Sequence, residues 1–244
     1  MNRLYVVLLL RGLTKTSEAQ SLVEKIANEV RRTGDVVLRF AFRSNCGVAH
    51  MDAGEFDAAA AEFEKAGRII TKAEASVLRV NHHYNLGELA YQGANYRTAL
   101  DQFQKAEDTL GGVTTPVDVA QLVNAGIGLC HLDLGGLTQA RQRESLVDPL
   151  PDTWSFDPTM VLAFQARLLE RRGSIEEAFE FISGQRASLE DRLLPAWLKT
   201  LPLELRLARK LGKENWTQLV HEGVSVADGL GFRARANELK DWLL

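Results

Sequence analysis

The residues that most often carry catalysis or bind metals are few in this chain, and they are not grouped. Of the 5 histidines, only His82 and His83 are neighbours, and adjacent helical residues point about 100° apart, so this pair cannot chelate one ion. The sequence has no His-Glu-x-x-His motif, no Cys-x-x-Cys motif and no EF-hand loop. Gly126 and Gly128 fall inside an apolar helical stretch and do not form a phosphate-binding loop. We therefore expect no catalytic residues, no cofactor and no metal.

Charge and hydropathy exclude two further classes of protein. The 244 residues include 29 Lys and Arg against 32 Asp and Glu, a formal net charge of −3, whereas proteins that bind nucleic acid over a large surface are more basic. Residues 5–10 are apolar, but a membrane-spanning helix needs about 20 such residues. Cys46 and Cys130 lie in apolar stretches, as buried reduced thiols do. We expect a cytoplasmic protein that contacts neither membranes nor nucleic acid directly.

The elements that must position any site are set by an internal repeat. Six residues of one segment recur 40 positions later in the same order, with small and aromatic residues in matching places. A fixed period of about 20–50 residues is typical of solenoids, in which each repeat is one supersecondary unit. No apolar–polar alternation of strand length competes with helical periodicity. The matching residues are Asn45, Gly47, Phe56, Ala59, Phe63 and Ala66, then Asn85, Gly87, Tyr96, Ala99, Phe103 and Ala106.

Weaker copies extend this pattern over the rest of the chain. We expect a single domain over residues 1–244, with the clearest repeats in 40–180 and degenerate or capping copies in 1–38 and 189–244. Each copy is predicted to be two helices joined by a turn, and Gly54, Gly135, Gly173 and Gly212 suit a positive φ in those turns. The apolar residues 5–10, at the start of an end repeat, suggest that the chain is a fragment of a larger protein.

The repeat resembles the tetratricopeptide repeat (TPR). Leu86-Gly87 in a first helix, then Ala99, Phe103 and Ala106 in a second, match that family's pattern, although the spacing is 40 instead of about 34 and no Trp opens the repeats. The resemblance implies an all-α, right-handed α-solenoid of stacked helix pairs, a TPR-like superhelix. It also implies a non-catalytic protein- or peptide-binding scaffold. The long repeats are similar to the arms of large bacterial signalling ATPases and transcriptional regulators, which implies a regulatory or sensor module.

A partner of such a solenoid binds the concave face, which the first helices line. Asn45 and Asn85 recur in register there, with Asn124 one helical step away. A carboxamide donates and accepts hydrogen bonds at once, so a row of them can hold an extended peptide backbone; in peptide-binding relatives of the repeat, Asn at this place has that role. The expected peptide-binding residues of the concave face are Asn45, Asn81, Asn85, Glu88, Asn124, Arg167, Arg171, Arg206 and Lys210.

Two alternatives stay open. The late part of the predicted groove is basic, through Arg167, Arg171, Arg206 and Lys210, which would suit a small acidic or phosphorylated metabolite. The chain could instead be a structural module that forms homo-oligomers through its apolar ends, residues 5–10 and 242–244. A protein or peptide partner on the concave face is the interpretation that we favour.

Overall fold

A computed structural model describes residues 17–71, 76–111, 117–147, 157–190 and 194–244. Every regular element within these ranges is a helix, which confirms the all-α class. The apolar residues 5–10 lie outside the described ranges. The helices are α2 (Ser17–Thr33), α3 (Val36–Asp52), α4 (Phe56–Ile70), α5 (Ser76–Gln92), α6 (Tyr96–Leu110), α7 (Val117–Asp133), α8 (Leu137–Glu144), α9 (Thr159–Arg171), α10 (Ile175–Glu190), α11 (Leu194–Lys210), α12 (Trp216–Leu230), α13 (Arg233–Lys240) and the 3₁₀ turn η1 (Asp241–Leu243).

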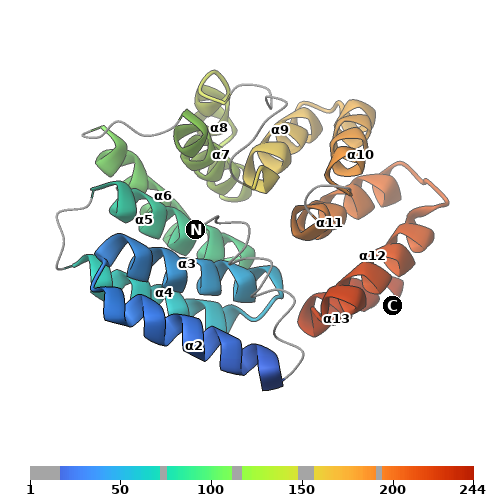
Figure 1. Cartoon of the computed structure of the whole chain (residues 1–244). Helices are drawn as coiled ribbons and strands as arrows, with labels where there is room; N and C mark the ends of the chain where they lie inside the picture. Colours follow the sequence, from blue (N-terminus) through green and yellow to red (C-terminus); the bar gives the residue numbers. More distant parts are fainter. Residues whose placement is uncertain (1–16, 72–75, 112–116, 148–156, 191–193) are drawn as a thin grey trace.

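The helices follow one another as antiparallel pairs around a curve (Figure 1). The pairs are α3–α4, α5–α6, α7–α8, α9–α10 and α11–α12, and each packs on the next, as the repeat predicts. None of the described helices is both long and apolar enough to cross a membrane.

Glycines and phenylalanines hold the first two pairs, α3–α4 and α5–α6, together. The ring of Phe103 in α6 lies against Gly87 in α5, where a Cβ atom would come within 2.7 Å of the ring, and against Gly126 in α7. Phe63 in α4 lies against Gly47 in α3 in the same way, and both rings are fully buried. The repeated glycines are therefore required by the close approach of a ring, and the repeated phenylalanines fill the space between successive first helices.

The turns between first and second helices confirm the role of the predicted glycines. Gly54, Gly135, Gly173 and Gly212 all have positive φ, between 65° and 91°. In the second pair the equivalent residue is Ala94, whose φ of 56° makes it the only non-glycine residue with a positive φ in the described part of the chain. Because a Cβ atom disfavours this region, the α5–α6 turn carries backbone strain that the other turns avoid.

Helix α9 joins two large apolar cores. Val161 and Phe164 pack with α5–α8, whereas Leu162 and Ala166 pack with α10–α13. Ala53, at the end of α3, also belongs to the second core although it is far from α10–α13 in sequence. The curve therefore brings the last helices of the chain back to the C-terminal end of α3.

Candidate functional site on the concave face

The first helices of the pairs line the inside of the curve. Side chains of α5, α7 and α9 meet through Tyr91, Asp133 and Arg167, and Lys199 of α11 reaches Asp52 of α3 and Glu88 of α5. These contacts join residues of different repeats across the curve. They identify α3, α5, α7, α9 and α11 as the helices of the concave face.

The asparagines of the predicted ladder have different surroundings. Asn85 is buried, and its Nδ2 donates a hydrogen bond of 2.7 Å to Oγ of Ser44 in the neighbouring repeat. Asn45 and Asn81 are half-buried, and neither side-chain carboxamide forms a hydrogen bond with any residue that the structure describes. Asn85 thus fixes the spacing of α3 and α5, and Asn45 and Asn81 are the carboxamides that are available to a ligand.

Asn124 lies on another face of its helix. Its Oδ1 accepts a hydrogen bond of 2.9 Å from Nη1 of Arg143 in α8, and its Nδ2 donates one of 2.9 Å to the carbonyl of Ala120. Equivalent contacts tie α3 to α4 and α5 to α6, between Arg43 and Glu62 and between His83 and Gln102. Asn124 therefore belongs to a set of contacts within helix pairs.

A buried ionic cluster closes the concave face beside α3 and α5. The Nζ of Lys199 lies 3.1 Å from Oδ1 of Asp52 and 3.2 Å from Oε1 of Glu88, and it also pairs with Asp157 before α9. The Lys199 side chain is only 5% exposed. The sequence pattern did not predict that Lys199 contacts α3 and α5. A single cation among Trp197, Leu198 and Leu201 could have indicated a buried ion pair, because an unpaired lysine is seldom buried.

The pKa values in this cluster follow from burial and from unequal charge. Burial raises the pKa of Glu88, and the charges of Asp157 and Asp52 raise it further against the effect of Lys199. Burial would lower the pKa of Lys199, but Asp157, Asp52 and Glu88 together raise it well above 10.5. Burial opposes the charge of Asp157, yet Lys199 and hydrogen bonds from Lys199 and Thr159 lower its pKa. One ammonium group therefore serves three carboxyl groups.

A second polar cluster joins α5, α7 and α9. Arg167 Nη2 lies 2.5 Å from Oδ1 of Asp133 and Nη1 lies 2.6 Å from Oδ2, which is a bidentate pair. The Tyr91 hydroxyl donates to Asp133 at 2.8 Å and accepts from Arg167 at 2.8 Å. Burial raises the pKa of Tyr91, so the hydroxyl keeps its proton. Each member of this cluster has a hydrogen-bond partner within it, although Nε of Arg167 is buried and has no partner among the described residues.

The remaining cations of the predicted groove are also paired. Arg206 and Lys210 each lie 2.6 Å from a carboxylate oxygen of Glu170, and Arg171 donates to the carbonyl of Leu132 at 3.2 Å. An acidic metabolite would have to compete with Asp133 and Glu170 for these groups. Arg206 and Lys210 share the one carboxylate of Glu170, and Arg171 contacts only a carbonyl, so the late groove keeps an excess of positive charge despite these contacts.

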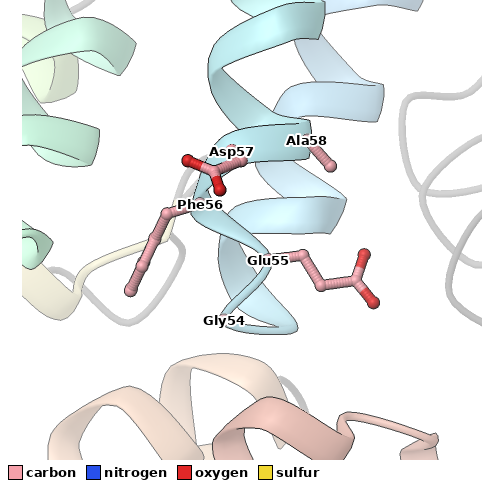
Figure 2. Close-up of a pocket in the computed structure, with 5 residues that line it drawn as sticks. All are labelled: Gly54, Glu55, Phe56, Asp57 and Ala58. Atoms are coloured by element: carbon pink, nitrogen blue, oxygen red, sulfur yellow. The ribbon is translucent and has the colours of Figure 1, made fainter.

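A hollow at the start of α4 is a weaker candidate (Figure 2). Its lining is the continuous stretch Gly54, Glu55, Phe56, Asp57 and Ala58. Binding sites usually combine polar groups that converge from several elements, and this hollow has a single turn and the first residues of one helix. Within the described ranges, no three His, Cys, Asp or Glu side chains are grouped as metal ligands would be.

The helix pairs, their glycine–phenylalanine contacts and the positive-φ turns decide the architecture. The fold is TPR-like. Among solved structures the chain is similar to YrrB, a TPR protein with an unusual peptide-binding site, with 15% identity, 88% of this chain and 97% of that chain covered, and a TM-score of 0.39. It is also similar to PilF of Pseudomonas aeruginosa, with 16% identity, coverage of 98% and 96%, and a TM-score of 0.42.

A third solved structure is matched over only a part of its own chain. Naa15/Naa10 bound to HypK-THB matches with 14% identity and a TM-score of 0.31, over 92% of this chain and 32% of that chain. No protein-family model matches this sequence, and no curated protein does. The TPR-like character of the fold thus rests on the helix pairs themselves.

Proposed function

We propose that this chain is a non-catalytic scaffold that holds an extended segment of a protein partner on its concave face. The observation that carries the proposal is the pair of half-buried carboxamides, Asn45 and Asn81, which have no hydrogen bond to the described residues. Because their polar atoms are not buried without a partner, both carboxamides can donate to and accept from a bound peptide backbone. The two side chains belong to neighbouring first helices, α3 and α5.

The position of these asparagines on their helices supports the same surface. Asn45 is seven residues before Asp52, and Asn81 is seven residues before Glu88. Seven residues are close to two full turns, so each asparagine lies on the same helix face as a carboxylate that reaches Lys199 across the curve, about 10 Å away along the axis. This spacing supports a concave position for both carboxamides.

We also propose a biological setting. The resemblance of the long repeats to the arms of large bacterial signalling proteins supports a regulatory or sensor role, and two buried, unpaired cysteines support a cytoplasmic location. Self-association through residues 242–244 keeps some support, because Leu243 and Leu244 are exposed apolar side chains, although the exposed side chains of the neighbouring α12, such as Thr217 and Gln218, are polar.

A peptide-display selection against the full chain tests the proposal. Peptides that bind the wild-type protein are then titrated against the double variant Asn45→Ala/Asn81→Ala. Two lost hydrogen bonds of about 1 kcal/mol each predict a loss of affinity of about 30-fold. The matched control is Asn237→Ala, an exposed asparagine on α13. Equal affinities for the double variant and the wild type would exclude the concave carboxamides as the binding surface.

A further inference from the structure

The structure contains contacts that a simple solenoid does not have. Each repeat of a solenoid normally touches only its neighbours. Here Lys199 pairs with Glu88, which is 111 residues away in sequence, and Nη2 of Arg235 donates a hydrogen bond of 3.1 Å to Gln92, 143 residues away. Gly54 also lies against α13, because a Cβ atom there would be 3.2 Å from Cβ of Ala234. Non-adjacent repeats are thus tied together.

The contacts that tie them are mainly polar, whereas neighbouring pairs pack chiefly through apolar side chains. The pairs pack through continuous apolar cores, and of the residues that close the curve only Ala53 belongs to one. The central contact is the cluster of Lys199 with Asp52, Glu88 and Asp157, in which carboxyl groups outnumber the ammonium group. Desolvation offsets most of the attraction in such a cluster, so its net stabilisation is small, but opening it would leave buried charges without their counter-charge.

The cluster also occupies the surface that the proposed function needs. Asp52 and Glu88 lie on the same helix faces as Asn45 and Asn81. The Lys199 side chain lies over the C-terminal ends of these two faces and is itself almost fully buried. A peptide that follows the concave faces of α3 and α5 would therefore meet Lys199.

We propose that Lys199 is a latch that holds the superhelix closed, and that a protein partner reaches the concave face of α3 and α5 only when this latch is released. That the excluded ligand is a protein partner rests on the proposed function. The closure of the superhelix by Lys199 does not depend on that function. Release separates α11 and α13 from the ends of α3 and α5, and it leaves the apolar contacts between successive pairs in place.

Distance measurements between paired spin labels test the latch in the full chain. Ala60 on α4 and Asn237 on α13 are exposed and lie on opposite sides of the closure, so both are replaced by Cys and labelled. The native Cys46 and Cys130 do not interfere, because they are buried and burial raises the pKa of each to about 12. A second label pair, Ala60→Cys with Thr98→Cys, lies on one side of the closure and reports whether the pairs α3–α4 and α5–α6, which meet through α4 and α5, stay packed.

The variant Lys199→Met removes the charge with little change of volume, and Lys105→Met is its control, because Lys105 forms an exposed pair with Asp101. The latch predicts longer and broader 60–237 distances for Lys199→Met, wild-type distances for Lys105→Met, and an unchanged 60–98 distance in both. Wild-type 60–237 distances in a folded Lys199→Met variant would overturn the latch.

A second variant keeps the test decisive if Lys199→Met does not fold. Ala234 is exposed on α13 and faces Gly54, so Ala234→Trp wedges the closure open without leaving a buried charge; Ala187→Trp on α10 is its control. A protein that is open about a tenth of the time gains about tenfold in affinity for the selected peptides when it is held open. Longer distances without any gain in affinity would leave the latch standing and contradict the concave-face function, whereas unchanged distances with Ala234→Trp would refute the latch.

Discussion

Replacing Arg167 by Met tests whether the cluster of Tyr91, Asp133 and Arg167 organises the middle of the solenoid. The side chains of Arg167 and Asp133 are only 11% and 12% exposed. Met is close to Arg in length and keeps the apolar contacts of the stem, so the change mainly removes the charge and three hydrogen bonds, two to Asp133 and one to the Tyr91 hydroxyl. The Asp133 carboxylate is then left buried, with only the Tyr91 hydroxyl as a donor within the cluster.

The expected cost is about 3–5 kcal/mol of unfolding free energy, the usual range for breaking a buried pair by removing one partner. Asp133→Asn should have a cost of the same kind, since it leaves the guanidinium group without a counter-charge. The double variant Arg167→Met/Asp133→Asn leaves no uncompensated charge, so its destabilisation should be smaller than the sum of the two single effects by about 1–3 kcal/mol.

Urea denaturation followed by circular dichroism measures these differences. Arg172→Met is a suitable control, because Arg172 pairs with Glu144 at the surface and exposed pairs contribute about 0–1 kcal/mol. Strictly additive effects of the Arg167 and Asp133 substitutions would refute the inference that the two groups form one coupled unit.

Two further predictions concern Glu88 and Ala94. Burial raises the pKa of Glu88 above 4.5, so the stability that its protonated form contributes is complete below pH 4.5 and is lost as the pH rises through the raised pKa. Glu88→Gln should therefore be more stable than the wild type at neutral pH. In urea titrations, the difference in unfolding free energy should shrink toward pH 4.5. A difference that grows on acidification would contradict this sign. Ala94→Gly should raise the unfolding free energy by about 0.5–1 kcal/mol, since glycine tolerates the φ of 56°. The control Ala60→Gly on α4 should lower the unfolding free energy by a similar amount. Destabilisation by Ala94→Gly would contradict the inference that the backbone at Ala94 is strained.

Much of the architecture follows from local sequence. The glycines and phenylalanines at matching positions are sufficient to predict the helix pairs, because each ring needs a facing residue without a side chain and each turn needs a residue that tolerates a positive φ. These requirements act within one repeat or between neighbours, so a period of 40 residues displays them directly. Ala94 shows that the turn geometry is kept even where the residue type disfavours it.

The surroundings of the candidate site residues were decided by tertiary structure. Asn45 and Asn85 are equivalent in sequence, but only Asn85 has a described partner, because Ser44 of the preceding repeat faces it. Arg167 is one of the predicted groove cations, but the repeat pattern gives no sign that Asp133 neutralises it and that the Tyr91 hydroxyl accepts a hydrogen bond from it. The repeat pattern shows which positions correspond in successive repeats, but it does not show which side chains of those repeats meet.

The curvature of the described helices is the feature that the sequence pattern predicts least. Each step from one helix pair to the next adds a small rotation, and the sum of these rotations decides whether the last helices meet the first. The sequence by itself determined the kind of unit and its order along the chain. Only the tertiary structure decided that Lys199 comes to lie between Asp52 and Glu88, because that position depends on the accumulated angle over several pairs, to which every side chain between them contributes.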